Sequence, residues 1–199
     1  MESPTSTLGL IERYREGDTG AFSLLFQKYR SRLAVLIYYR MGPELRARAE
    51  VDDILQETFL AASRQLSQFN YQSPGSFMAW LSRIAEHAIV DTARFQSRQK
   101  RDAGENLRLR SESNPGGPEP ADFNTPSRIF AQEERVHALF RKMDELSPEH
   151  REVILLAKIE GLSTQEIAAR MGKSREAVSL LLHRALKRFQ EIQSAAGPS

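Results

Sequence analysis

The sequence contains no cysteine and only four histidines, which lie far apart along the chain. Disulfides and metal sites with thiolate ligands are therefore excluded, because both need a cysteine sulfur. The histidines are too scattered to suggest a zinc cluster, so we expect neither a metal nor another cofactor. The lack of cysteine fits a reducing cytoplasm.

Long apolar runs are also missing from the sequence. No stretch approaches the roughly 18 residues that a membrane-spanning helix needs, and residues 1–7 lack the basic start and the apolar core of a signal peptide. We therefore expect a soluble, cytoplasmic protein with no membrane partner. The net charge is only +2, so bulk charge is a weak argument for nucleic acid binding.

The basic residues nevertheless gather in two places. Residues 94–110 hold six basic residues against two acidic ones, and residues 163–190 have the same balance. Between these patches, residues 111–126 carry three acidic residues and no basic one. Two positive patches separated by an acidic stretch indicate contact with nucleic acid at two places.

The acidic stretch also divides the chain. Residues 114–126 contain four prolines and two adjacent glycines, which is typical of a linker. On both sides apolar residues recur with helical spacing, and no stretch alternates as a strand does. The sequence therefore predicts an all-α fold of two small helical domains joined by a flexible linker. The predicted boundaries are an N-terminal domain over residues 1–98, a basic then acidic linker over 99–126, and a C-terminal domain over 127–193.

The N-terminal domain is predicted to contain three helices. Asp18 can cap the first, which should end near Gly42 and Pro43, and the second should begin at Val51 or Asp52. The third should follow a loop over residues 70–75.

This third helix leads directly into the first basic patch. Ser76 is a suitable N-terminal cap for it. Phe77 and Trp80 share its apolar face, so we expect both in the core rather than at a binding surface.

The C-terminal domain carries the most specific motif. Ser147 followed by proline marks a helix start, and Ser163 with Glu166 forms a capping box. The short helix that follows should run to Arg170, the turn after it contains Gly172, and Ser174 can cap the next helix. Two helices joined by a tight turn containing glycine predict a helix-turn-helix. A plain αα-hairpin with a solvated basic face is the alternative.

In a helix-turn-helix the second helix lies in the major groove, where its exposed first turns meet base edges and its later basic residues meet phosphates. The candidate duplex-contacting residues are Lys173, Ser174, Arg175, Glu176, Ser179, Leu180, His183, Arg184 and Lys187. Leu180 is an unusual apolar member of this set.

Several segments together resemble one family. Leu146 to Leu156, then Glu160 to Ser163, then the helix-turn-helix are similar to the C-terminal domain of extracytoplasmic-function (ECF) sigma factors, which belong to the sigma-70 family of bacterial RNA polymerase subunits. Residues 52–60 and 77–85 resemble the N-terminal domain of the same family. Lys173 departs from the pattern, since many relatives have an apolar residue there.

The resemblance implies a sigma factor, and not an enzyme, that binds core RNA polymerase and directs promoter-specific initiation for a stress or envelope-signal regulon. The first domain would dock on the clamp helices of the largest subunit through Asp52, Asp53, Gln56 and Glu57. It would read the minus-ten element as a single strand through Asn70, Tyr71, Gln72, Ser73, Arg83, His87, Asp91, Arg94 and Arg98. The second domain would read the minus-thirty-five element as duplex. The implied partners are core RNA polymerase (clamp helices and flap), promoter DNA and an anti-sigma factor.

Two other functions compete with this interpretation. A stand-alone helix-turn-helix regulator would bind DNA without polymerase, commonly as a dimer on a palindromic site. An enzyme with a DNA-binding appendage has no support, because no phosphate-binding glycine loop and no nucleophile with its base are present. The acidic residues at the start of the second helix have a plainer explanation too, since a helix dipole favours carboxylates there.

Overall fold

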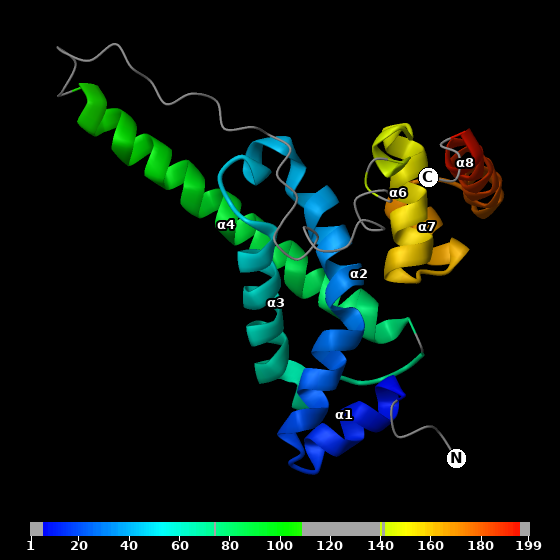
Figure 1. The fold of residues 1–199 in the computed structure, drawn as a ribbon, viewed down its shortest axis with the longest axis horizontal. Coiled ribbons are helices and arrows are strands. Elements are labelled where there is room, and N and C mark those ends of the chain that lie inside the picture. The colour runs from blue at the N-terminus through cyan, green and yellow to red at the C-terminus, as the bar shows by residue number, and fades with distance from the viewer. Residues whose placement is uncertain (1–5, 74, 109–139, 141, 196–199) are drawn as a thin grey trace.

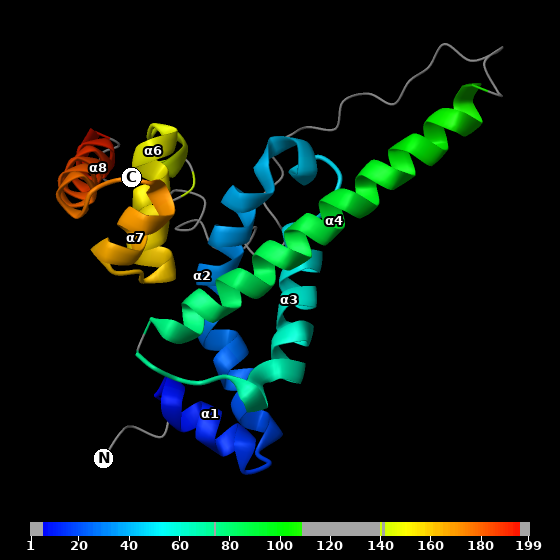
Figure 2. The ribbon, with the colours of Figure 1, turned by 180° about the vertical axis from the view of Figure 1, so that it is seen from behind.

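The computed structural model describes residues 6–73, 75–108, 140 and 142–195, with the backbone alone for residues 99–108 and 195. All the regular structure in these ranges is helical, so the predicted all-α class is confirmed. Figures 1 and 2 show α1 to α4 as one group of helices and α6 to α8 as a second group beside it.

Helices α1 (Thr7–Arg15) and α2 (Thr19–Arg46) open the first group. The predicted cap of α2 is confirmed, because the Asp18 carboxylate accepts a hydrogen bond from the Ala21 N–H at 3.3 Å. The helical backbone is interrupted at Gly42, whose φ is 66°, and one further turn continues to Arg46. Glycine suits this position because it adopts positive φ without a side-chain clash.

Helix α3 (Val51–Gln65) continues into a 3₁₀ turn (Leu66–Gln68), and α4 (Ser76–Arg108) follows the loop. The prediction that Ser76 caps α4 in the usual way is wrong. Its hydroxyl instead accepts from the backbone N–H groups of Gln72 and Ser73, both at 3.2 Å, and donates to the Ser73 carbonyl at 2.7 Å. Ser76 therefore shapes the loop before the helix rather than the first turn within it.

Helices α2, α3 and α4 pack on one another around a shared apolar core. Leu33, Leu55 and Phe77 are at most 1 % exposed, as the helical spacing of the apolar residues requires. Long α4 crosses the group and projects past it (Figure 2). It reaches Arg108 and so runs through the first ten residues of the predicted linker. Residues 109–126 of the predicted linker lie outside the described residues.

The second group begins at α6 (Pro148–Ile154), which the predicted Ser147 cap opens by accepting from the His150 N–H at 3.3 Å. The helix continues as a π-helical segment (Leu155–Glu160) and ends at Gly161, whose φ is 76°. Helices α7 (Thr164–Met171) and α8 (Arg175–Ala195) complete the group and pack on each other. Their core includes Ile167 and Val178, both fully buried.

Candidate functional site

The loop before α4 forms one wall of a pocket. Of the residues predicted to read a single strand, Asn70, Gln72, Ser73 and Arg83 line it together. Tyr71 is not part of the pocket lining, because its side chain is half-buried and packs against the core. The opposite wall belongs to the C-terminal group and consists of Gly161, Leu162 and Glu166.

A second pocket adjoins the first between α3 and α4. It is lined by Arg83, His87 and Asp91, with Glu57 on the α3 side. Further along α4, Arg94 and Arg98 line a shallower groove.

The candidate residues on α4 therefore follow one side of the helix, and each of them is exposed. They are Arg83, His87, Asp91, Arg94 and Arg98. Asp91 partly offsets the positive charge of this row, since its carboxylate lies 3.7 Å from Arg94. Their contact with DNA stays a prediction.

Trp80, which was expected in the core, is more exposed than that expectation allows. Phe77 is buried in the core as expected, but Trp80 is only half-buried and lines both pockets. Its ring lies 4.7 Å from that of Phe69 and 5.5 Å from that of Phe77. The indole is thus held by aromatic neighbours while part of it stays open to the pockets. The helical spacing of Trp80 is that of a core residue, so the sequence carries no signal for this partial exposure.

The predicted polymerase contacts lie in the first turns of α3. Asp53, Gln56 and Glu57 are exposed, whereas Asp52 is half-buried. The sequence analysis overlooked Leu60, which is 60 % exposed one turn further on. Its helical register with the other residues was the available signal.

Leu60 belongs to an apolar groove between α2 and α3. The groove is lined by Phe22, Phe26, Phe59 and Leu60, with Gln56 and Ser63 at its edge. Polar α3 residues and an apolar groove thus form one continuous surface, suited to a protein partner with both kinds of contact.

The helix-turn-helix is confirmed in its local detail. The Ser163 N–H donates to the Glu166 carboxylate at 2.8 Å, and the Glu166 N–H donates back to the Ser163 hydroxyl at 3.3 Å. Hydrogen bonds from Ser163 lower the pKa of Glu166. Gly172 ends α7 with a φ of 63°, and the Ser174 hydroxyl caps α8 by accepting from the Ala177 N–H at 3.1 Å.

Helix α8 buries one side and exposes the other. Val178 and Ala185 are fully buried, while the predicted DNA face is exposed throughout: Ser174, Arg175, Glu176, Ser179, Leu180, His183, Arg184 and Lys187. Lys173 is exposed as well, but its ammonium lies 2.8 Å from the Glu149 carboxylate and lowers the pKa of Glu149. Lys173 is thus engaged within the second group of helices.

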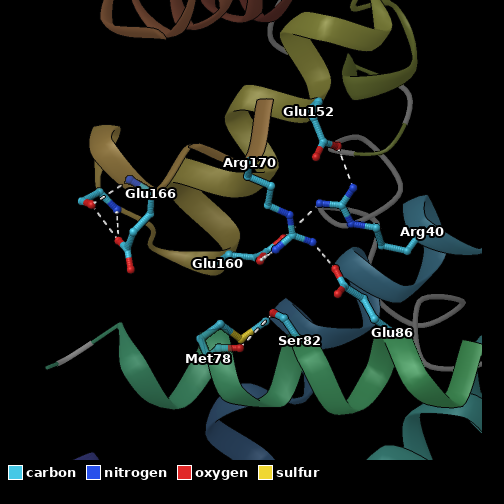
Figure 3. Close-up of polar contacts among 9 residues, drawn as sticks. Arg40, Met78, Ser82, Glu86, Glu152, Glu160, Glu166 and Arg170 are labelled. Carbon is cyan, nitrogen blue, oxygen red and sulfur yellow. Dashed lines mark hydrogen bonds and ion pairs between the residues drawn. The ribbon is translucent and has the colours of Figure 1, made fainter. Parts of the chain in front are cut away.

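An ion-pair network joins the two groups of helices (Figure 3). The Glu160 carboxylate, only 1 % exposed, lies 3.0 Å from Arg40 of α2 and 3.1 Å from Arg170 of α7. Arg40 also pairs with Glu152 at 2.8 Å, and Arg170 pairs with Glu86 of α4. Burial raises the pKa of Glu160 more than the two guanidinium groups lower it.

Two backbone carbonyls of the second group also lie close to the first group of helices. Arg32 donates to the Ile159 carbonyl at 2.6 Å. A Cβ placed on Gly75 would lie 2.9 Å from the Gly161 carbonyl oxygen, so Gly75 permits this close approach. The ion pairs of Arg40 with Glu152 and Glu160 give this arginine a role that the sequence alone does not indicate.

Across residues 6–73, 75–108, 140 and 142–195 there is no group of three acidic or histidine side chains that could hold a metal ion. In the same part of the chain no helix combines the length and the apolar character that crossing a membrane requires.

A helix-turn-helix beside a group of helices with polar pockets is typical of DNA-binding transcription factors. The profile of the family described as "ECF sigma factor" matches residues 5–193. The chain therefore belongs to the ECF sigma factor family, whose members are regulatory DNA-binding proteins rather than enzymes.

Two individual sigma factors agree with this assignment. The chain is 32 % identical over 186 residues to the ECF RNA polymerase sigma factor BldN of Streptomyces coelicolor, a match that covers 92 % of the chain and 64 % of that protein. It thus spans somewhat less than two thirds of BldN. It is 31 % identical over 182 residues to the RNA polymerase sigma factor CarQ of Myxococcus xanthus, covering 92 % and 94 %. The solved structure of CnrH with the cytosolic domain of CnrY is similar over 97 % of the chain and 99 % of that chain, with 24 % identity and a TM-score of 0.47.

Proposed function

We propose that this sigma factor binds core RNA polymerase through α3 and reads a promoter at two places. The observation that carries the proposal is the presence, in one chain, of two exposed polar surfaces of different shape. Helix α8 offers a convex, exposed polar side, whereas the loop before α4 offers a pocket.

The two surfaces suit two states of DNA. A helix fits the major groove of a duplex, where the base edges present distinct hydrogen-bonding patterns. A pocket suits an unstacked base, which a duplex does not supply. We therefore assign the minus-thirty-five element to α8 and the melted minus-ten strand to the pocket of Asn70, Gln72, Ser73 and Arg83. Trp80, which lines the same pocket, joins them as a ring on which a base can stack.

A strand can use the first pocket only if the two domains move apart. Glu166 of α7 lines this pocket, and a carboxylate repels a phosphate backbone. Since Arg40 and Arg170 hold the domains together here, we expect the network around Glu160 to break when the strand enters.

The surface around Gln56, Glu57 and Leu60 is our candidate for the polymerase contact. Its exposed acidic and amide groups beside an apolar groove match a helical partner that carries both basic and apolar residues. On the resemblance to the family we further propose contact of the second domain with the polymerase flap, an anti-sigma factor as inhibitor, action in the cytoplasm, and no catalytic activity of the chain itself.

Transcription with and without polymerase tests the proposal. Core polymerase plus this chain should give defined start sites on native genomic fragments that neither gives alone. Binding of this chain alone to promoter fragments as a dimer, with no start site directed, would instead favour a stand-alone regulator.

A further inference from the structure

Leu180 is an apolar side chain in the middle of the exposed side of α8. It is 50 % exposed, whereas its sequence neighbours Leu181 and Leu182 are half-buried and pack against the core. The fold therefore does not need a leucine at this position, and its exposed surface is available to a ligand of α8.

The surroundings of Leu180 favour DNA over an apolar protein surface. Residues three and four positions away share its side of a helix, and here they are Glu176, Ala177, His183 and Arg184, all exposed. A protein contact built on one leucine would usually sit among other apolar residues. In Figure 1, α8 lies on the outer side of its group, away from α1 to α4.

The major groove offers one apolar group at its base edges, which is the C5 methyl of thymine. We infer that Leu180 recognises a thymine methyl in the duplex that α8 reads. This inference rests on the proposed function and adds to it a specificity determinant. Leu180 would favour thymine over cytosine at one base pair by removing the methyl group from water, while Arg175 and His183 bond to polar base edges nearby.

Uracil supplies the test, because it differs from thymine only in lacking that methyl. Minus-thirty-five sequences are first selected from a randomised pool with core polymerase plus the full chain. Each thymine of the selected element is then replaced by uracil, one at a time, and binding of the holoenzyme is measured for the native chain, Leu180→Ala and Leu180→Met. Leu24→Ala, which trims a 39 % exposed leucine on α2, is the matched control.

Loss of one buried methyl should weaken binding of the native holoenzyme about fourfold at a single thymine position. Leu180→Ala should bind the thymine and uracil duplexes equally at that position, whereas Leu180→Met and Leu24→Ala should keep the difference. A general effect of uracil on the duplex would weaken binding of the native chain and of Leu180→Ala equally. Only a direct contact makes the effect of uracil depend on the residue at position 180.

The inference is overturned if uracil has the same effect at every position for the native chain and for Leu180→Ala. That result would leave the proposed function standing, since initiation would still depend on the chain. If no start site appears with the native chain, the proposed function itself fails, and the two failures are thereby distinguished.

Discussion

Replacing Arg40 by methionine should open the contact between the two domains. Arg40 is one of two cations that neutralise Glu160, a carboxylate with 1 % of its surface exposed. Methionine keeps the apolar stem but leaves Glu160 with Arg170 alone and takes away the partner of Glu152. Removal of one partner from a buried pair costs about 3–5 kcal/mol, and because Arg170 remains beside Glu160 we expect a cost below this range, about 2 kcal/mol. The closed arrangement should then lose about 30-fold in population relative to the open one.

A second change should restore part of that loss. Because burial raises the pKa of Glu160, replacing it by neutral glutamine removes a group that is costly to keep charged. Glu160→Gln alone should therefore loosen the contact only mildly, and in combination with Arg40→Met it should recover much of the lost closed population. The two changes should be strongly non-additive, as expected for residues in direct contact.

The distance between the domains is the quantity to measure. The chain has no cysteine, so one label can be placed at Gln27→Cys on α2 and another at Gln193→Cys on α8. Arg188→Met is the matched control, because Arg188 pairs with Glu191 at 3.3 Å within α8 and takes no part in the network. The reasoning is wrong if Arg40→Met gives the same distance distribution as the native chain. It is also wrong if adding Glu160→Gln to Arg40→Met increases the distance between the labels further.

Four other outcomes follow from the structure. Gly75→Val should open the domains without changing any charge, because its side chain would meet the Gly161 carbonyl; an unchanged distance in the same labelled chain would contradict this. Because the pKa of Glu160 is raised, the folded chain holds this proton to higher pH than the unfolded chain, and the stability of the native chain should fall relative to Glu160→Gln as the pH rises above about 4.5. Urea unfolding at several pH values measures this, and a free-energy difference between the two chains that does not change with pH would refute it. Ser163→Ala should cost about 1 kcal/mol of unfolding free energy through loss of the capping box, measured by urea unfolding, and a loss near zero would show that the box is dispensable. Leu60→Ala should weaken binding to core polymerase several-fold while leaving the melting temperature unchanged, since the side chain is mostly exposed, and unaltered affinity would remove the groove from the interface.

Local features of the fold were predictable because local chemistry sets them. Asp18, Ser147 and Ser163 cap the helices expected of them, and Gly172 ends α7 in the left-handed backbone conformation that favours glycine. A cap needs only neighbouring residues, so a sequence shows it directly. The exception is Ser76, whose hydroxyl bonds to the preceding loop because that loop folds back over it.

Features that depend on tertiary packing were less accessible. Arg40 and Glu160 lie 120 positions apart, and no spacing rule relates them. Arg170 counts toward a basic patch in the sequence, but in the structure acidic partners on two elements engage it. Trp80 has the helical spacing of a core residue, and only the path of the loop beside it leaves part of its ring at a pocket.

Run-off transcription with core polymerase on native genomic fragments is the most direct measurement of promoter recognition by this chain. Defined start sites should appear only when polymerase and the chain are both present, and they should fade when Arg175 and His183 of α8 are replaced by alanine. Tight DNA binding without polymerase, together with no directed start site, would contradict the account.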